Sequence, residues 1–349
     1  MSEISTISEF LLHAGTEYRV FDMGRTISEL DGQTFLDIEH GSLPVPRPRQ
    51  GHLWCGIVFF NRSQSAQHYV WFIKLPIDEQ SRVVGASRQH FLQIIIDALG
   101  DTFEPQNDTQ ARLPDNPYSF VPSQSLLADF NSFSRATLKL PESQHFAAVQ
   151  HYLQSPSVID WRTLAHQGIA DLAAKMPQQQ WQKRFVEALP SLSPAFLNIL
   201  LGAMEHYPVS SDLTSTLLNL AREQSDSSIQ MAILRALTQS EDNREVNAFI
   251  TKLLDEPALR GADLLTVIAG RHWHRFGDNA LLAHFLETCA SVDDGRWFAP
   301  LYRDLVAIPD IRTNMLGAIR NPERSDAMSK AIGSLFSNSG ASSVTRSKA

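Results

Sequence analysis

The feature of this sequence that most constrains its fold is an internal repeat with a period of 34 residues, which begins near residue 160. Each repeat holds an apolar segment, a polar break and a second apolar segment. Small residues occupy the same place in three of the first segments, at Gly202, Ala236 and Gly270. Because a period of this length is typical of helix pairs that bury their apolar faces by stacking, the sequence predicts consecutive antiparallel pairs. The blocks are 160–193, 194–227, 228–261, 262–295 and the residues from 296 onward.

The repeats predict an all-α region over residues 142–336. The tetratricopeptide repeat has the same length, but its pattern of Trp, Gly-Tyr and Pro is missing here. We therefore expect a HEAT-like αα-solenoid or another αα-repeat, preceded by an α+β module, in a chain that is mainly α overall. The polar residues 337–349 that follow the repeats predict a disordered tail.

Residues 1–100 change their hydrophobic period repeatedly, which predicts a small α+β module. Two apolar runs, 53–62 and 68–77, are rich in aromatic and β-branched residues and are joined by a short polar link. These runs predict an antiparallel hairpin. The remaining periodic segments predict helices at 3–14, 31–41 and 87–100 and a strand at 18–23.

Residues 101–141 differ in composition from both neighbouring regions. They contain five prolines among Asp, Asn, Gln and Ser residues, which predicts a linker between the module and the repeats. The middle of this segment carries enough Phe and Leu to dock on a folded part of the chain. We therefore expect a partly ordered crossover.

The balance of charges argues against nucleic acid as a partner. The net charge is −8, and residues 1–110 carry 8 Lys and Arg against 14 Asp and Glu. Residues 111–349 carry 22 Lys and Arg against 24 Asp and Glu. Neither part has the basic excess that binding to a phosphate backbone requires.

Cysteine usage and the lack of long apolar runs predict a cytoplasmic protein. The two cysteines, Cys55 and Cys289, are far apart and lack the C-x-x-C spacing, so we expect neither a disulfide framework nor a thiolate zinc site. The first residues have no basic start or long apolar core of the kind found in signal peptides. No run approaches the roughly 20 apolar residues that a membrane helix needs.

The segment "RHWHRF" (271–276) is the most tempting candidate for a metal or nucleic-acid site. The repeat register places it at the end of a first helix, just before a polar break. On a helix, His272 and His274 point in nearly opposite directions and cannot bind one metal ion. Because basic residues are favoured near the C-terminus of a helix, we interpret the segment as a helix end.

Five residues of the module are candidates for binding a partner. Asp22 and Arg25 stand on either side of a glycine in "DMGR", which presents an ion pair or a binding turn. Arg47 and Arg49 lie on one side of an exposed, extended segment, "PRPRQ". Lys74 lies in the second strand of the hairpin. The alternative for these residues, a local contact in a turn or a solvated loop, stays open.

No residue is predicted to be catalytic, to bind a cofactor or to bind a metal. His145, His151 and His166 could each act as an acid or base, but none lies in H-E-x-x-H, G-x-S-x-G or a paired-carboxylate pattern. Neither a P-loop nor G-x-G-x-x-G occurs in the chain.

Several segments resemble an uncharacterised bacterial family, a domain of unknown function in gammaproteobacteria whose members are about this long. The segments are "SEISTISEFLLHAGTEYRVFDMGR", "HYVWFIKLPIDE", "RQHFLQIIIDALG", "NPYSFVP" and "QGIADLAA". The resemblance covers nearly the whole chain and is strongest before residue 125. It implies a bacterial cytoplasmic protein, and it brings no activity, cofactor or catalytic residue with it.

The sequence favours a non-enzymatic adaptor or scaffold that binds a protein partner. Stacked helix pairs expose an extended surface of the kind that binds proteins or peptides. An uncovered strand edge in the module would add a docking site for a partner segment, or for a second copy of the chain in a homodimer. The alternative is a hydrolase or transferase whose pocket lies between the module and the first helix pairs. The first residues to test for that activity are Asp22, Arg25 and Lys74.

Overall fold

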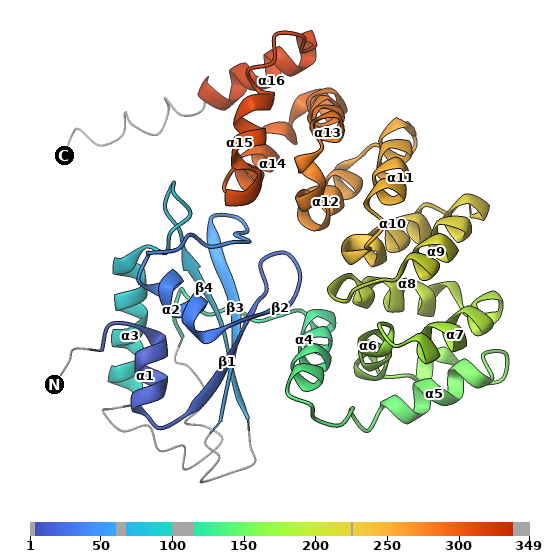
Figure 1. Cartoon of the computed structure of the whole chain (residues 1–349), viewed down its shortest axis with the longest axis horizontal. Coiled ribbons are helices and arrows are strands. Elements are labelled where there is room, and N and C mark those ends of the chain that lie inside the picture. The colour runs from blue at the N-terminus through green and yellow to red at the C-terminus, as the bar shows by residue number, and fades with distance from the viewer. Residues whose placement is uncertain (1–3, 61–67, 100–114, 225, 338–349) are drawn as a thin grey trace. The chain divides into compact units, whose positions relative to one another are not determined.

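The computed structural model describes residues 4–60, 68–99, 115–224 and 226–337. Two compact units divide the chain, one formed by residues 1–143 with 307–309 and the other by residues 144–306 with 310–349. The chain is mainly helical, and a small antiparallel sheet lies in the first unit (Figure 1). The predicted link of the hairpin, the first third of the predicted linker (101–114) and nearly all of the predicted tail lie outside the described residues.

The sheet of the first unit has four antiparallel strands in the order β2-β1-β3-β4. The predicted hairpin is confirmed, since β3 pairs with β4 from His52 opposite Pro76 to Phe59 opposite Tyr69. The predicted strand at 18–23 is β1, which pairs with β3. Sequence reasoning missed β2, because three residues are too few to show an alternating pattern. The strands are β1 (Glu17–Asp22), β2 (Ser28–Leu30), β3 (His52–Phe60) and β4 (Tyr69–Pro76).

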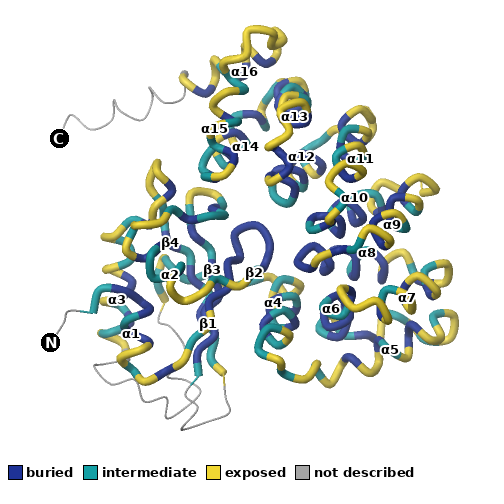
Figure 2. The backbone as a smooth tube through the Cα atoms, in the orientation of Figure 1, coloured by how far each residue is buried: buried dark blue, intermediate teal, exposed yellow. Residues whose placement is uncertain are grey.

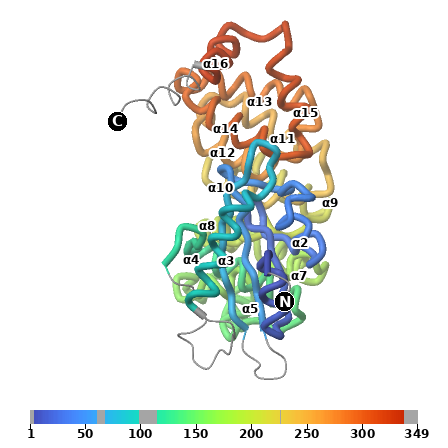
Figure 3. The backbone as a smooth tube through the Cα atoms, turned by 90° about the vertical axis from the view of Figure 1, so that its left-hand side faces the viewer, coloured from blue at the N-terminus to red at the C-terminus, as the bar shows by residue number. Residues whose placement is uncertain are grey.

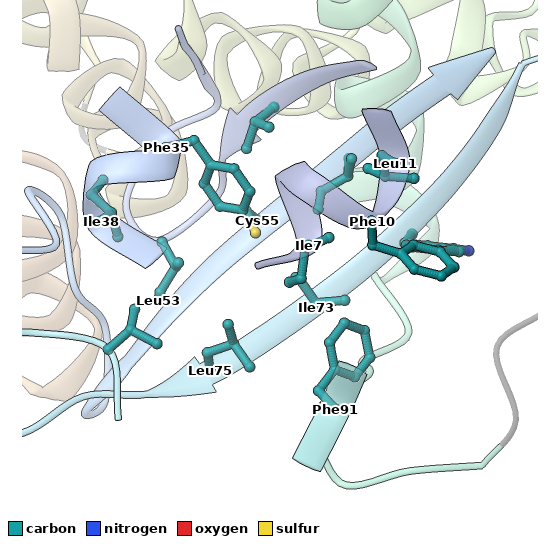
Figure 4. Close-up of a cluster of buried hydrophobic side chains, with 14 of the residues drawn as sticks. Ile7, Phe10, Leu11, Phe35, Ile38, Leu53, Cys55, Ile73, Leu75 and Phe91 are labelled. Carbon is teal, nitrogen blue, oxygen red and sulfur yellow. The ribbon is translucent and has the colours of Figure 1, made fainter. Parts of the chain in front are cut away.

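Three helices cover one face of this sheet, as predicted for the module. They are α1 (Ile7–His13), α2 (Gly32–Glu39) and α3 (Gly85–Leu99). Every second residue of β3 points to this face, so that Leu53 and Cys55 pack against side chains from all three helices (Figure 4). The resulting apolar core accounts for the stability of the hairpin, which two strands alone would not have in water.

A fourth helix, α4 (Gln124–Thr137), covers the opposite face. The Phe130 ring of α4 lies 5.5 Å from that of Phe21 and 4.9 Å from that of Phe72, measured between ring centroids. It can approach because β3 has a glycine below it: a Cβ atom on Gly56 would lie 2.4 Å from Phe130 Cε2. The described part of the segment predicted as a linker thus includes a helix of the first unit, so strands of the sheet are buried on both faces.

The second unit consists of helix pairs. Each 34-residue block contains one pair, as the repeat predicts: α6 and α7, α8 and α9, α10 and α11, α12 and α13, and α14 and α15. Two further helices, α5 and α16, flank the pairs. The bounds are α5 (Phe146–Gln154), α6 (His166–Lys175), α7 (Gln179–Ala188), α8 (Pro194–Ala203), α9 (Ser211–Glu223), α10 (Ser227–Ala236), α11 (Asn243–Asp255), α12 (Ala262–Arg271), α13 (Asn279–Ser291), α14 (Phe298–Val306), α15 (Pro309–Ala318) and α16 (Asp326–Ser337).

The first helices of successive pairs pack against one another in chain order, α6 on α8, α8 on α10, α10 on α12 and α12 on α14. Leu200, Leu234 and Ile268 occupy equivalent places in three of these helices and are completely buried. The second helices carry more exposed residues (Figure 2). The progression of the pairs along the unit can be followed by colour in Figure 3.

We predict that Gly56→Ala destabilises the first unit. The new Cβ atom would clash with Phe130 Cε2, and overpacking of this kind typically costs about 1–3 kcal/mol. Denaturant unfolding should therefore show a lower midpoint, whereas Gly85→Ala, whose Cβ would meet open space, should change it little. If Phe130→Ala lowers the free energy of unfolding by the same amount in wild type and in the Gly56→Ala background, the clash between the two residues does not cause the destabilisation.

Candidate functional site

The predicted partner-binding residues lie at one end of the sheet in the first unit. Asp22 is the last residue of β1, and the next residue, Met23, donates its backbone N–H to Trp54 of β3 over 2.8 Å. Trp54 in turn pairs with Lys74 of β4. Because the strands are antiparallel, the end of β1, the start of β3 and the end of β4 meet here, and the loop that carries Arg47 and Arg49 joins them.

Asp22 is a buried carboxylate among arginines. One oxygen accepts the N–H of Gly24 over 2.8 Å, and the other has no hydrogen-bond partner. Burial raises the pKa of Asp22 to about 7, although the Gly24 N–H and the charges of Arg47, Arg25 and Arg49 act in the opposite direction. The carboxyl group can therefore hold or release a proton near neutral pH.

The arginine loop packs closely on the turn after β1. Arg25 donates to the backbone oxygen of Pro48 from Nε and Nη2, over 3.0 and 2.7 Å. Arg47 donates to Ser28 Oγ over 2.5 Å. The backbone oxygen of Arg47 lies so close to Gly24 that a Cβ atom on Gly24 would be only 2.0 Å from it. The prediction of an exposed basic loop is thus wrong, because Arg47 and Arg49 are half-buried and their segment is held against the turn.

Trp54 links the remaining two predicted residues. The guanidinium carbon of Arg49 lies 4.1 Å from the centroid of the Trp54 ring, and Lys74 Nζ lies 5.6 Å from it. The indole Nε1 donates to the backbone oxygen of Arg49 over 2.9 Å. Sequence reasoning did not single out Trp54, because it lies in an apolar run that reads as core. These cation–π contacts hold the basic side chains on the sheet.

The segment 271–276 ties neighbouring helix pairs of the second unit together. Buried His272 donates from Nε2 to the backbone oxygen of Leu234 over 2.9 Å and accepts from Arg275 Nε at Nδ1 over 3.1 Å. Burial, and next the charge of Arg275, lower the pKa of His272 well below its usual value. Arg275 also donates to Asn243 Oδ1 over 2.8 Å and to the backbone oxygen of Leu237 over 3.3 Å.

The structural interpretation of this segment therefore agrees with its contacts, but one detail of it is wrong. His272 and His274 do not lie on one helix, because α12 ends at Arg271 and a 3-10 turn runs over Trp273–Gly277. Their ring centroids are 6.3 Å apart. Within the described residues, no group of three or more His, Cys, Asp and Glu side chains could hold a metal ion.

A second buried carboxylate, that of Glu205, connects three successive repeats. It accepts from Arg235 Nε over 2.7 Å and from Arg271 Nη2 over 2.9 Å. Burial alone would raise the pKa of Glu205, but the charges of Arg271, His206 and Arg235 outweigh it and hold the pKa well below the usual value. Sequence reasoning missed this cluster, because its members are 30 and 66 residues apart.

The histidines considered as acids or bases are exposed and lie apart in the chain, His145 just before α5, His151 within α5 and His166 at the start of α6. The carboxylates considered as partners of His166 have other contacts. Asp160 forms an exposed ion pair with Arg162 over 3.0 Å, and Asp171 accepts from Gln167 over 3.2 Å. None of these contacts assembles a catalytic set.

Grooves recur between the second helices of neighbouring pairs. One of about 530 Å³ lies between α7 and α9, and one of about 320 Å³ lies between α9 and α11. A third, of about 420 Å³, lies between α13 and α15 and is closed at one end by α16. Their walls combine apolar, amide and charged side chains, as in surfaces that bind peptides.

Comparison with protein families shows to which family the chain belongs. The model of a family described as "Protein of unknown function (DUF3549)" matches residues 2–336. No curated protein and no solved structure matches the chain. In the described part of the chain, no helix combines the length and the apolar character that crossing a membrane requires.

We predict that Asp22→Asn makes the protein more stable at neutral and alkaline pH. The pKa of Asp22 in the folded protein, about 7, exceeds the ordinary value of 3.8 for an aspartate, so wild-type stability falls as pH rises from about 4 to about 7. The stability of the variant should not fall in this way, so above pH 7 its free energy of unfolding should exceed that of wild type by up to about 4 kcal/mol. Denaturant unfolding from pH 4 to pH 8 measures it, with exposed Asp97→Asn as the control. Parallel pH profiles of wild type and variant would contradict the raised pKa.

We predict that Glu205→Gln destabilises the second unit, because it leaves two arginines without their carboxylate. Since Arg235 is partly exposed to solvent, we expect a loss of about 2 kcal/mol at pH 7. The folded pKa of Glu205 is lowered, so this advantage of the wild type should shrink as pH falls below about 4.5. Unfolding at pH 7 and pH 3 tests both points, and Glu223→Gln is the exposed control. An equal loss at both pH values would contradict the ionic role.

Proposed function

The chain belongs to the DUF3549 family of proteins of unknown function, and we propose that it is a non-enzymatic adaptor or scaffold that binds a protein partner. The observation that carries the proposal is the recurrence of grooves between the second helices of neighbouring pairs. A row of grooves offers one partner several contacts at once, which gives specificity without a single deep pocket.

The proposal includes the architecture of the second unit, which we take to be a HEAT-like αα-solenoid. Three observations support this: the 34-residue spacing of the pairs, the packing of first helices in chain order, and the buried polar contacts between repeats. In such an arrangement each pair packs on its neighbours, the long Arg271 side chain reaches Glu205 two repeats away, and the second helices form a continuous outer surface.

The walls of the grooves suit a polypeptide. In the groove between α9 and α11, Phe249 and Leu218 lie among charged side chains, and an ion pair between Arg222 and Glu245 crosses it at 3.8 Å. The groove between α7 and α9 is lined by Lys183 and by glutamine side chains. Apolar surface would supply affinity, and the charges around it would select the partner.

The sheet of the first unit offers less to a partner than the sequence suggested. The outer edge of β4 already binds a segment of its own chain, since Lys74 donates its N–H to the Tyr118 oxygen over 2.7 Å and Phe120 donates to the Phe72 oxygen over 3.1 Å. The other edge is β2, with three residues. We therefore place the partner on the second unit, and self-association through the first unit is the weaker alternative.

A hydrolase or transferase is the second candidate function, and the observation that favours it is Asp22. A buried carboxyl group with a pKa of about 7 and arginines around it is suited to transferring protons or stabilising negative charge. An enzyme would lose its turnover in Asp22→Asn, whereas an adaptor would keep its partner.

We propose the cytoplasm as the compartment, since both cysteines, Cys55 and Cys289, are free and buried.

We predict that affinity purification of the tagged full chain from its natural host, followed by mass spectrometry, recovers one partner reproducibly. With purified partner, Lys183→Glu in the groove between α7 and α9 should lower the affinity by about tenfold, because it reverses a charge on the proposed surface. Lys330→Glu, at an exposed position of α16, is the matched control. Repeated recovery of the chain alone, together with turnover of a small-molecule library by the pure protein, would contradict the adaptor function.

A further inference from the structure

The groove bounded by α13, α15 and α16 has an apolar floor, and we call it the C-terminal groove. Its floor is formed by the buried side chains of Leu282, Leu286 and Met328. Small residues, Ala283 and Gly317, form its walls, so the floor is open from outside. Helix α13 packs directly on α11 and on α16, whereas the groove separates it from α15.

The charged side chains around this groove already have partners within the protein. Glu287 accepts the backbone N–H of Ser325 over 3.1 Å and also binds its hydroxyl group, at the start of α16. Arg324 donates to Ser329 Oγ and to the backbone oxygen of Ile319, each over 3.0 Å. These partners are neutral groups, and the lining holds one acidic and one basic side chain, so it has no net charge that would select a charged ligand.

An amide pair supplies further polar groups. Asn314 Nδ2 donates to Asn279 Oδ1 over 3.1 Å, across the groove from α15 to α13. This bond leaves the amide N–H groups of Asn279 and the amide oxygen of Asn314 for a ligand. One donor and one acceptor side by side match the C=O and N–H groups of a peptide main chain, and the apolar floor below them matches an aliphatic side chain.

We propose that the C-terminal groove binds a partner's peptide segment by inserting one uncharged aliphatic side chain, of the size of Leu or Met, between α13 and α15. The amides of Asn279 and Asn314 bind the adjacent main-chain groups of that segment. This inference rests on the proposed function and specifies it, since it names the chemical class that the scaffold recognises and the place where it does so.

The probe is N-acetyl-leucine methylamide, an aliphatic side chain between two peptide groups, added to the full chain with labelled methionine methyl groups. The chain has seven methionines, so the methyl spectrum is simple, and Met328→Leu identifies the signal from the floor. We expect the Met328 signal to shift with a millimolar dissociation constant, as is usual for a fragment of this size. Charged N-acetyl-glutamate methylamide should shift it at least tenfold less.

Two variants test the place of binding. A Cβ atom on Gly317 meets open space, so Gly317→Leu should fill the groove without disturbing α15 and abolish the Met328 shift. Gly333→Leu, at an exposed position of α16 that also faces open space, is the matched control and should bind as the wild type does. Asn314→Leu removes the amide and should weaken binding by about five- to tenfold.

Each other outcome overturns the proposal. No Met328 shift at saturating probe, or an equal shift in Gly317→Leu, excludes this groove as the site. Equal binding of isoamyl alcohol, which has the aliphatic group without an amide, shows an apolar pocket that does not recognise peptides. If the wild type forms dimers and Gly317→Leu abolishes them, the groove is occupied by a second copy of the chain and not by a partner's peptide. A purified partner that binds Gly317→Leu as tightly as wild type refutes the groove and leaves the adaptor function standing.

Discussion

The carboxylate of Glu205 is the interaction on which the centre of the second unit depends. Helix pairs of this length cannot bury their apolar faces alone, and apolar contacts by themselves tolerate sliding of one pair over the next. Glu205 fixes the position of Arg235 and Arg271, from the two following repeats, at hydrogen-bond distance. His272 adds a bond to Leu234 in the preceding repeat. A buried charge without these partners would be costly. Glu205 therefore keeps its hydrogen bonds only when the helix pairs stack in this register, and its loss of them would oppose any other register.

In the first unit a steric constraint has the same role. Gly56 lets the Phe130 ring lie on the sheet, and α4 then covers a face that would otherwise expose Phe21 and Phe72. The other buried glycine contact, Gly24 beneath the Arg47 oxygen, brings the arginine loop onto Asp22. Both contacts join segments distant in the chain, and neither leaves room for a methyl group. These close contacts make this end of the sheet rigid. A rigid end fits residues that stabilise the fold better than it fits a mobile binding loop.

The polar groups of the second unit differ in what they leave for a ligand. Glu205, His272 and Arg275 use their hydrogen-bonding capacity to join repeats, so the segment that looked most chemical in the sequence, 271–276, serves the fold. The Asn279–Asn314 pair, by contrast, bridges an open groove with amide groups to spare. The proposed recognition by the second helices rests on a difference in exposure: the first helices are more buried, and the second helices carry more exposed residues.

The sequence by itself determined the helix pairs, the hairpin and the helices of the module, because hydrophobic period, caps and breaks act over a few residues. It also identified five residues at one end of the sheet without showing that they meet there. The burial of Asp22, the docking of α4 and the Glu205 cluster depended on contacts between residues far apart in the chain, which no local pattern encodes. Tertiary structure decided these, because the cost of burying a charge or a ring is set by the partners that packing brings to it.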